Sequence, residues 1–184
     1  MIISKIIFFI DLFAWLLPPF RQKGNKYFIY FLLLAVSDPI FFLLNWTYDI
    51  SSPPYYIIIS LLAFISLVKK KLLFLILLLS IGFIIYLQNA ELIFLNFVIH
   101  FFILVYFLKD LVITTSEKDK IIIFNLILVL YEVSVMTKFA VSFLFSTGRL
   151  LYDFATVFDI FIGIFFTIFN DKKSPEIKLP IEAG

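Results

Sequence analysis

The sequence predicts an all-α membrane protein, a bundle of about seven transmembrane helices with the N-terminus outside and the C-terminus in the cytoplasm. The composition, the apolar runs and the placement of basic residues predict it. Of the 184 residues, 63% are hydrophobic and 15% are charged, and the mean hydropathy is +1.10. Soluble domains have about 45–50% apolar and 25% charged residues, so a water-soluble globule is excluded.

The apolar runs define the expected helices. A membrane-spanning helix needs about 20 mostly apolar residues, and clusters of charged or turn-forming residues mark where one ends. Cutting the chain at these clusters leaves seven runs, at residues 2–17, 27–48, 55–68, 72–87, 92–108, 121–145 and 150–169. The third and fourth runs are short, and the lysines at 69–71 between them predict a tight hairpin whose charges reach the membrane surface.

Residues 170–184 follow the bundle as a short tail. It contains Lys172, Lys173 and two prolines, a composition that predicts a disordered segment weakly attracted to anionic lipid. A peptide that docks a protein partner is the alternative for this segment.

The basic residues predict the orientation, because they gather on every second connection. Four groups of three lie at residues 21–26, at 69–71, at 109–120 and at 172–178, and account for 12 of the 15 Lys and Arg residues. Cytoplasmic connections carry the excess of Lys and Arg, so these four face the cytoplasm. The alternation also requires an odd number of spans. The membrane is expected to be a plasma membrane.

Several classes of function are excluded. The chain has no cysteine, so it forms no disulfide and has no thiolate nucleophile. The net charge of +2 does not favour nucleic acid as a partner. The connections are too short to hold a soluble catalytic domain, and the last span contains no lysine to bind retinal. With a single histidine, we expect neither a metal nor a cofactor.

Five ionisable residues fall near the centres of five different spans. They are Asp11, Asp38, His100, Glu132 and Asp159. Such residues cost about 2.5–3.5 kcal/mol each inside a membrane, so they usually face the bundle interior and mark function. We expect them to form one substrate- or proton-binding centre, in which most carboxyls are protonated or share protons with His100. The alternative is that they are only interhelical hydrogen bonds. The spans at 55–68 and 72–87 lack comparable groups and are expected to lie toward lipid.

Pro39 follows Asp38 and predicts a helix kink. Proline removes one backbone hydrogen bond and frees a carbonyl near Ala35. That carbonyl and the Asp38 carboxyl could together hold a cation or a proton. A purely structural kink is the alternative.

Lys138 and Asp153 are further charges within the spans. Each lies six residues, about 9 Å, outward from Glu132 and Asp159 respectively. Their equal depth predicts a structural ion pair between Lys138 and Asp153, with Glu132 and Asp159 turned toward other helices. Closure of the outer end of a cavity is the functional alternative.

These observations favour a carrier or proton-linked solute-binding bundle whose partners are the lipid bilayer and a small polar solute or lipid. A membrane sensor or scaffold subunit that docks a protein through its tail is the alternative. A further alternative is an intramembrane lipid-modifying enzyme with carboxyls as general acid and base. We lean against an enzyme, because head-group chemistry favours an interface over the membrane centre.

Overall fold

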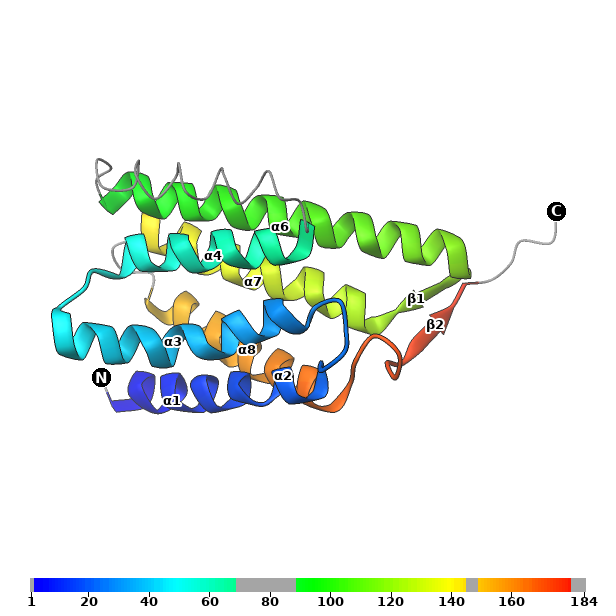
Figure 1. Ribbon diagram of the computed structural model, residues 1–184, viewed down its shortest axis with the longest axis horizontal. Helices are drawn as coiled ribbons and strands as arrows, with labels where there is room; N and C mark the ends of the chain where they lie inside the picture. The colour runs from blue at the N-terminus through cyan, green and yellow to red at the C-terminus, as the bar shows by residue number, and fades with distance from the viewer. Residues whose placement is uncertain (1, 69–88, 145–148, 180–184) are drawn as a thin grey trace.

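The computed structural model describes residues 2–68, 89–144 and 149–179 and is an all-α bundle with one small β-ribbon (Figure 1). The expected span at 72–87 and the lysines at 69–71 lie outside the described residues. The elements are α1 (Ile2–Leu16), α2 (Pro18–Arg21), α3 (Phe28–Tyr48), α4 (Ser52–Val68), α6 (Asn89–Lys118), β1 (Lys120–Ile122), α7 (Ile123–Leu144), α8 (Arg149–Ile168) and β2 (Glu176–Lys178).

The membrane class is supported by the lengths of the helices. Within the described residues, four helices are long and apolar enough to cross a bilayer, over Phe28–Tyr48, Glu91–Lys118, Ile123–Ser142 and Leu150–Ile168. The shorter apolar helices α1 and α4 pack beside them. Five expected spans, at 2–17, 27–48, 55–68, 121–145 and 150–169, correspond to α1, α3, α4, α7 and α8 within a few residues.

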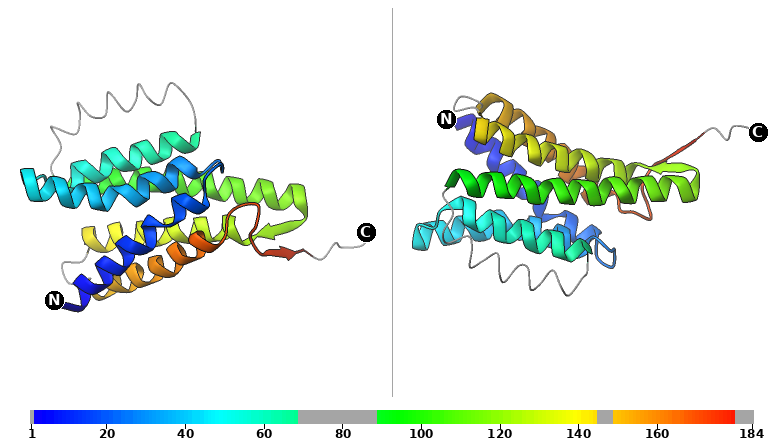
Figure 2. Two further views of the ribbon diagram at one scale, coloured as in Figure 1. Left: turned by 60° about the horizontal axis from the view of Figure 1, so that its bottom comes forward. Right: turned by 90° about the horizontal axis from the view of Figure 1, so that it is seen from above.

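The long helices lie side by side, with α6 against α4 and α7, and α8 against α1 and α7 (Figure 2). Gly163 allows the close approach of α8 to α1, because a Cβ at this position would lie 3.3 Å from the backbone oxygen of Ala14. The N-terminus and the turn between α3 and α4 share one end of the bundle. The segment between α2 and α3 and the β-ribbon share the other, which we call the basic end because it carries Lys23, Lys26, Lys118, Lys120 and Lys172.

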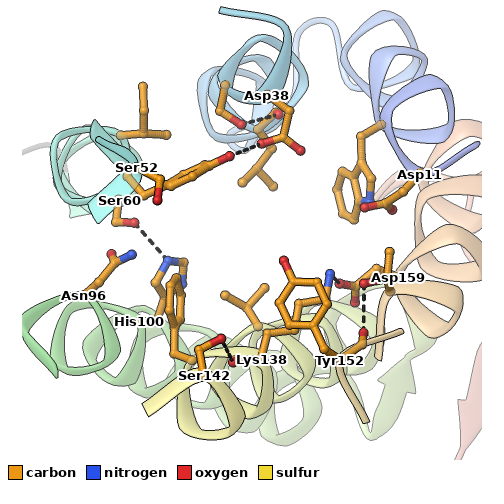
Figure 3. Close-up of a pocket in the computed structure, with 18 of the residues that line it drawn as sticks. Asp11, Asp38, Ser52, Ser60, Asn96, His100, Lys138, Ser142, Tyr152 and Asp159 are labelled. Atoms are coloured by element: carbon orange, nitrogen blue, oxygen red, sulfur yellow. Dashed lines mark hydrogen bonds and ion pairs between the residues drawn. The ribbon is translucent and has the colours of Figure 1, made fainter. Parts of the chain in front are cut away.

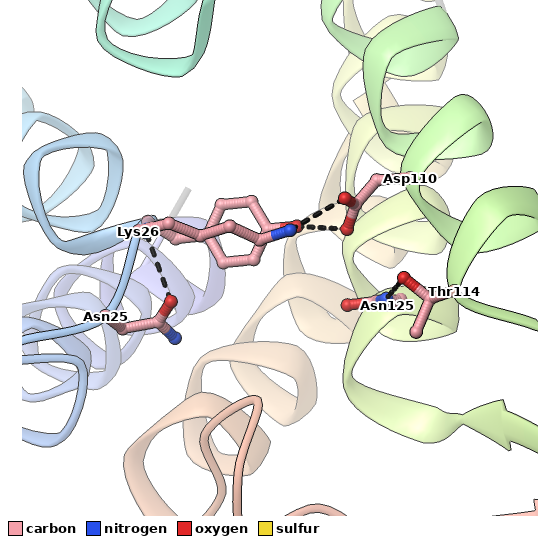
Figure 4. A network of polar contacts seen from close by, with 6 residues as sticks. Asn25, Lys26, Asp110, Thr114 and Asn125 are labelled. Carbon is pink, nitrogen blue, oxygen red and sulfur yellow. Dashed lines mark hydrogen bonds and ion pairs between the residues drawn. The ribbon is translucent and has the colours of Figure 1, made fainter. Parts of the chain in front are cut away.

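Helix α6 is longer than expected, because the residues expected to leave the helix after position 108 continue it to Lys118. Its 30 residues span about 45 Å, beyond the roughly 30 Å of a hydrocarbon core. The negative charge of Asp110 is balanced by a neighbouring basic side chain on the helix surface (Figure 4). Its carboxylate lies 2.7 Å from Lys26 Nζ and accepts a hydrogen bond of 2.5 Å from the Tyr27 hydroxyl. A paired charge of this kind does not terminate a helix.

The tail is partly ordered, so the expectation of disorder was wrong for residues 176–178. Here β2 pairs antiparallel with β1, joining Ile121 to Ile177 in register, and α7 begins at Ile123 rather than at 121. The Ile123 N–H donates to the Pro175 carbonyl at 3.0 Å, and the Phe124 N–H to Ser174 Oγ at 2.9 Å. The first N–H groups of a helix have no acceptors within the helix. For α7, the tail supplies these acceptors.

An aromatic core fills the half of the bundle next to the basic end. Phe31, Phe107, Phe124 and Phe166 are all at most 1% exposed. The ring centroids of Phe31 and Phe166 lie 4.7 Å apart, and those of Phe124 and Phe166 lie 5.1 Å apart. These rings come from α3, α6, α7 and α8, and the buried side chain of Gln22 lies beside them, where its amide donates to the Phe166 backbone oxygen at 2.9 Å.

Candidate functional site

A cavity of about 400 Å³ occupies the other half of the bundle (Figure 3). Its volume falls in the range of roughly 300–1,000 Å³ that small-molecule sites occupy. Helices α1, α3, α4, α6, α7 and α8 all contribute lining residues. The lining extends from the middle of the bundle to Ser52, the first residue of α4, and to Ser142, near the end of α7.

The structure brings the five ionisable residues together around this cavity. Asp11, Asp38, His100 and Asp159 line it, and Glu132 lies directly behind His100. The expectation that the helix at 55–68 lies apart from this centre was wrong. Its counterpart α4 contributes Ser60 and Tyr56, both hydrogen-bonded to members of the centre. Uncharged hydroxyl groups can lie within a span at little cost, so their presence in the sequence does not predict this role.

A chain of hydrogen bonds joins four helices at the centre. Ser60 Oγ on α4 lies 2.9 Å from His100 Nε2 on α6, and His100 Nδ1 lies 2.7 Å from Glu132 Oε2 on α7. The Tyr30 hydroxyl on α3 donates to the other Glu132 oxygen. Glu132 is 0% exposed, so its carboxyl group has both oxygens bound within the protein. The two ring nitrogens of His100 therefore link a serine hydroxyl to a buried carboxyl group.

Lys138 forms an ion pair with Asp159, whereas the sequence predicted Asp153 as its partner. Its Nζ lies 2.5 Å from Asp159 Oδ2, which corrects the expectation that Asp159 faces other helices. Side chains lean toward the N-terminus of their helix. Helices α7 and α8 are antiparallel, so their side chains lean in opposite directions along the bundle. Lys138 and Asp159 therefore lean toward each other. Asp153, the partner predicted from the sequence, also lines the cavity.

Asp38 and Pro39 lie in the middle of α3, which continues through the proline to Tyr48. The Tyr56 hydroxyl donates to Asp38 Oδ1 at 2.9 Å, and the Tyr55 hydroxyl donates to the Ser37 backbone oxygen at 2.7 Å. Two adjacent tyrosines of α4 thus support α3 where proline interrupts its backbone hydrogen bonding.

Three buried oxygen atoms lack hydrogen-bond partners among the described residues. They are Asp11 Oδ1, Asn96 Oδ1 and Asp159 Oδ1, and all three residues line the cavity. The sequence favours only a packing hydrogen bond for Asn96, although its position four residues before His100 puts both on one face of α6. Buried polar atoms are usually paired, so three unpaired acceptors in one cavity indicate a ligand site.

Comparisons with known proteins give no identification: no protein-family model, curated protein or solved structure matches the chain. Within the described residues, no three His, Asp or Glu side chains are placed to hold a metal ion. The function is therefore inferred from the chemistry of the cavity.

The Lys138–Asp159 pair predicts a thermodynamic coupling. Lys138→Met should lower the free energy of unfolding by about 3–5 kcal/mol, because it leaves a carboxylate that is 2% exposed without its cation. Lys138→Met combined with Asp159→Leu should recover much of that loss, since both buried charges are then removed. Unfolding in detergent micelles measures the difference. Additive losses, or better recovery with Asp153→Leu, would contradict this pairing.

Proposed function

We propose that the protein is a small carrier or proton-linked solute-binding bundle. The observation that carries this proposal is the cavity, because it places Asp11, Asp38, His100 and Asp159 around a space large enough for a solute. Ionisable groups inside a membrane protein commonly mark substrate pathways and proton relays. A polar solute entering the cavity would meet groups that can exchange protons with it.

One-sided access supports a carrier. The cavity reaches toward the end that holds the N-terminus, whereas the rings of Phe31, Phe124 and Phe166 fill the basic end. A carrier alternates access to a central site by moving one part of the bundle against the other. Release toward the basic end would require these rings to separate.

We further propose seven spans, with the N-terminus outside, in a plasma membrane. Among the longer described helices, α1, α4, α6 and α8 run in one direction and α3 and α7 in the other, and the basic residues of the described connections gather at one end of the bundle. Because basic connections stay in the cytoplasm, the cavity then faces outward.

Reporter fusions test this topology. A reporter active only in the cytoplasm should give signal when fused after Lys26, Lys71, Lys120 or the C-terminus. Fusions after residues 52, 89 and 148 should give none, because their connections carry few basic residues. Signal at 52 or 89 would overturn the proposed topology.

Proton sharing at the centre is tested by infrared spectroscopy of the protein in lipid. We expect a protonated-carboxyl band at pH 7, because neighbouring carboxyls away from water cannot all be ionised. The band should shift or vanish in Asp38→Asn or Glu132→Gln, but not in the control Asp49→Asn, which changes an exposed carboxyl outside the cavity.

The outcome separates the proton-linked bundle from the sensor or scaffold alternative. The amide variants keep the shape and much of the hydrogen bonding of the carboxyls. If solute binding and folding both survive them, the carboxyl protons are irrelevant and the scaffold is favoured. A missing band would mean that the carboxyls are ionised, which contradicts the shared-proton centre.

The lipid-modifying enzyme is a second candidate, favoured by the order of groups in Ser60, His100 and Glu132. One imidazole nitrogen contacts a serine hydroxyl and the other a carboxyl group, as in serine hydrolases. Those enzymes also need donors for the oxyanion. Ser60 lies in the middle of α4, where helix hydrogen bonds occupy the backbone N–H groups. Only side chains such as Asn96 could replace them, which ranks this candidate second.

A fluorophosphonate probe distinguishes the two candidates, because it reacts covalently with an activated serine. We expect no labelling of the protein in lipid nanodiscs. Labelling that is lost in Ser60→Ala and kept in Ser66→Ala would favour the enzyme. Ser66 is a matched control, because its hydroxyl donates to the Ala63 carbonyl on the same helix and does not line the cavity.

A further inference from the structure

We infer that the cavity binds a small organic ammonium ion that carries N–H donors. This inference rests on the proposed function and specifies its substrate class. Three independent features of the lining support it: its charge, its unpaired acceptors and its aromatic side chains.

The charge of the lining favours a cation. Asp11, Asp38 and Asp159 contribute carboxyls from three helices, and Asp153 adds a fourth carboxyl. Lys138 is the only lysine among the described lining residues, which include no arginine, and it is already bound to Asp159. Even without Asp153, three carboxyls therefore face one ammonium group. A cationic ligand would favour the ionised form of these carboxyls and take the place of the protons that they otherwise hold, whereas an anion would not.

The unpaired atoms specify hydrogen-bond donors. Asp11 Oδ1, Asn96 Oδ1 and Asp159 Oδ1 are all acceptors when the carboxyls are ionised, and the Asn96 residue is only 2% exposed. Figure 3 shows Asn96 on the side of the cavity opposite Asp11. A ligand that satisfies acceptors on both sides must donate hydrogen bonds from more than one position. Primary diamines and amino alcohols do so, and quaternary ammonium ions do not.

The aromatic side chains are suited to an ammonium group. Trp15, Tyr56, Tyr131 and Tyr152 all line the cavity, and cations are attracted to the faces of such rings. Lys138 shows this contact within the protein itself, because its Nζ lies 5.5 Å from the centroid of the Tyr152 ring. The ammonium of Lys138, held between a carboxylate and an aromatic ring, displays the chemistry that we assign to the ligand.

Trp15 provides the measurement. The chain has two tryptophans, and the second, Trp46, is 80% exposed and lies outside the lining. In a Trp46→Phe background, the emission of the full chain in lipid nanodiscs therefore reports the cavity. Three probes separate the features of the ligand: 1,4-diaminobutane has charge and N–H donors, tetramethylammonium has charge alone, and glycerol has donors alone.

We expect a saturable change of Trp15 emission with 1,4-diaminobutane, and binding at least tenfold weaker for tetramethylammonium and glycerol. Asp11→Asn and Asn96→Leu should each weaken diamine binding about tenfold or more. Asp49→Asn should leave it unchanged. Asp49 is exposed and has a left-handed φ of 49°, which asparagine tolerates, so this control makes the same chemical change outside the cavity.

Each other outcome overturns the inference in a defined way. Equal binding of tetramethylammonium would show that the cavity does not recognise N–H donors. Tighter binding of glycerol would assign a neutral polyol and leave solute binding intact. Binding of none of the three by folded protein would reject the ammonium class. The proposed function would then stand or fall separately on the carboxyl band and its response to Asp38→Asn.

Discussion

Within an apolar bundle, the carboxyl group of Glu132 must find its hydrogen bonds inside the protein, because lipid offers none. Tyr30 and His100 supply them, and Ser60 binds the far side of the imidazole. These contacts tie α3, α4, α6 and α7 at one depth. A shift of any of these helices by one turn would leave a buried polar group unpaired. This series of hydrogen bonds therefore fixes how the four helices are arranged.

The bundle is divided along its length by this polar level. Toward the basic end, Phe31, Phe107 and Phe166 belong to one buried aromatic core. Toward the other end, the same helices surround the cavity and its carboxyls. Close packing on one side supports the helices, so the other side can keep an open space with three unpaired oxygen atoms. The aromatic core and the cavity thus occupy different halves of the same helices.

The β-ribbon and Asp110 form contacts that pair polar groups at the basic end. The tail satisfies the first N–H groups of α7, and Lys26 with Tyr27 neutralises a carboxylate where α6 leaves the expected membrane core. Both contacts join segments that are distant in the sequence. They keep polar groups paired at the end that carries the basic residues, where the aromatic core requires the helices to stay close.

The sequence by itself determined the membrane class, most helix positions and the level at which the five ionisable residues lie, because hydropathy and depth depend only on position along each helix. Only the tertiary structure decided which side chains meet. Lys138 binds Asp159 because neighbouring antiparallel helices lean their side chains toward each other, and Ser60, Tyr56 and Asn96 join the site because of how α4 and α6 are rotated. Rotation and tilt depend on packing between helices, which no single apolar run encodes.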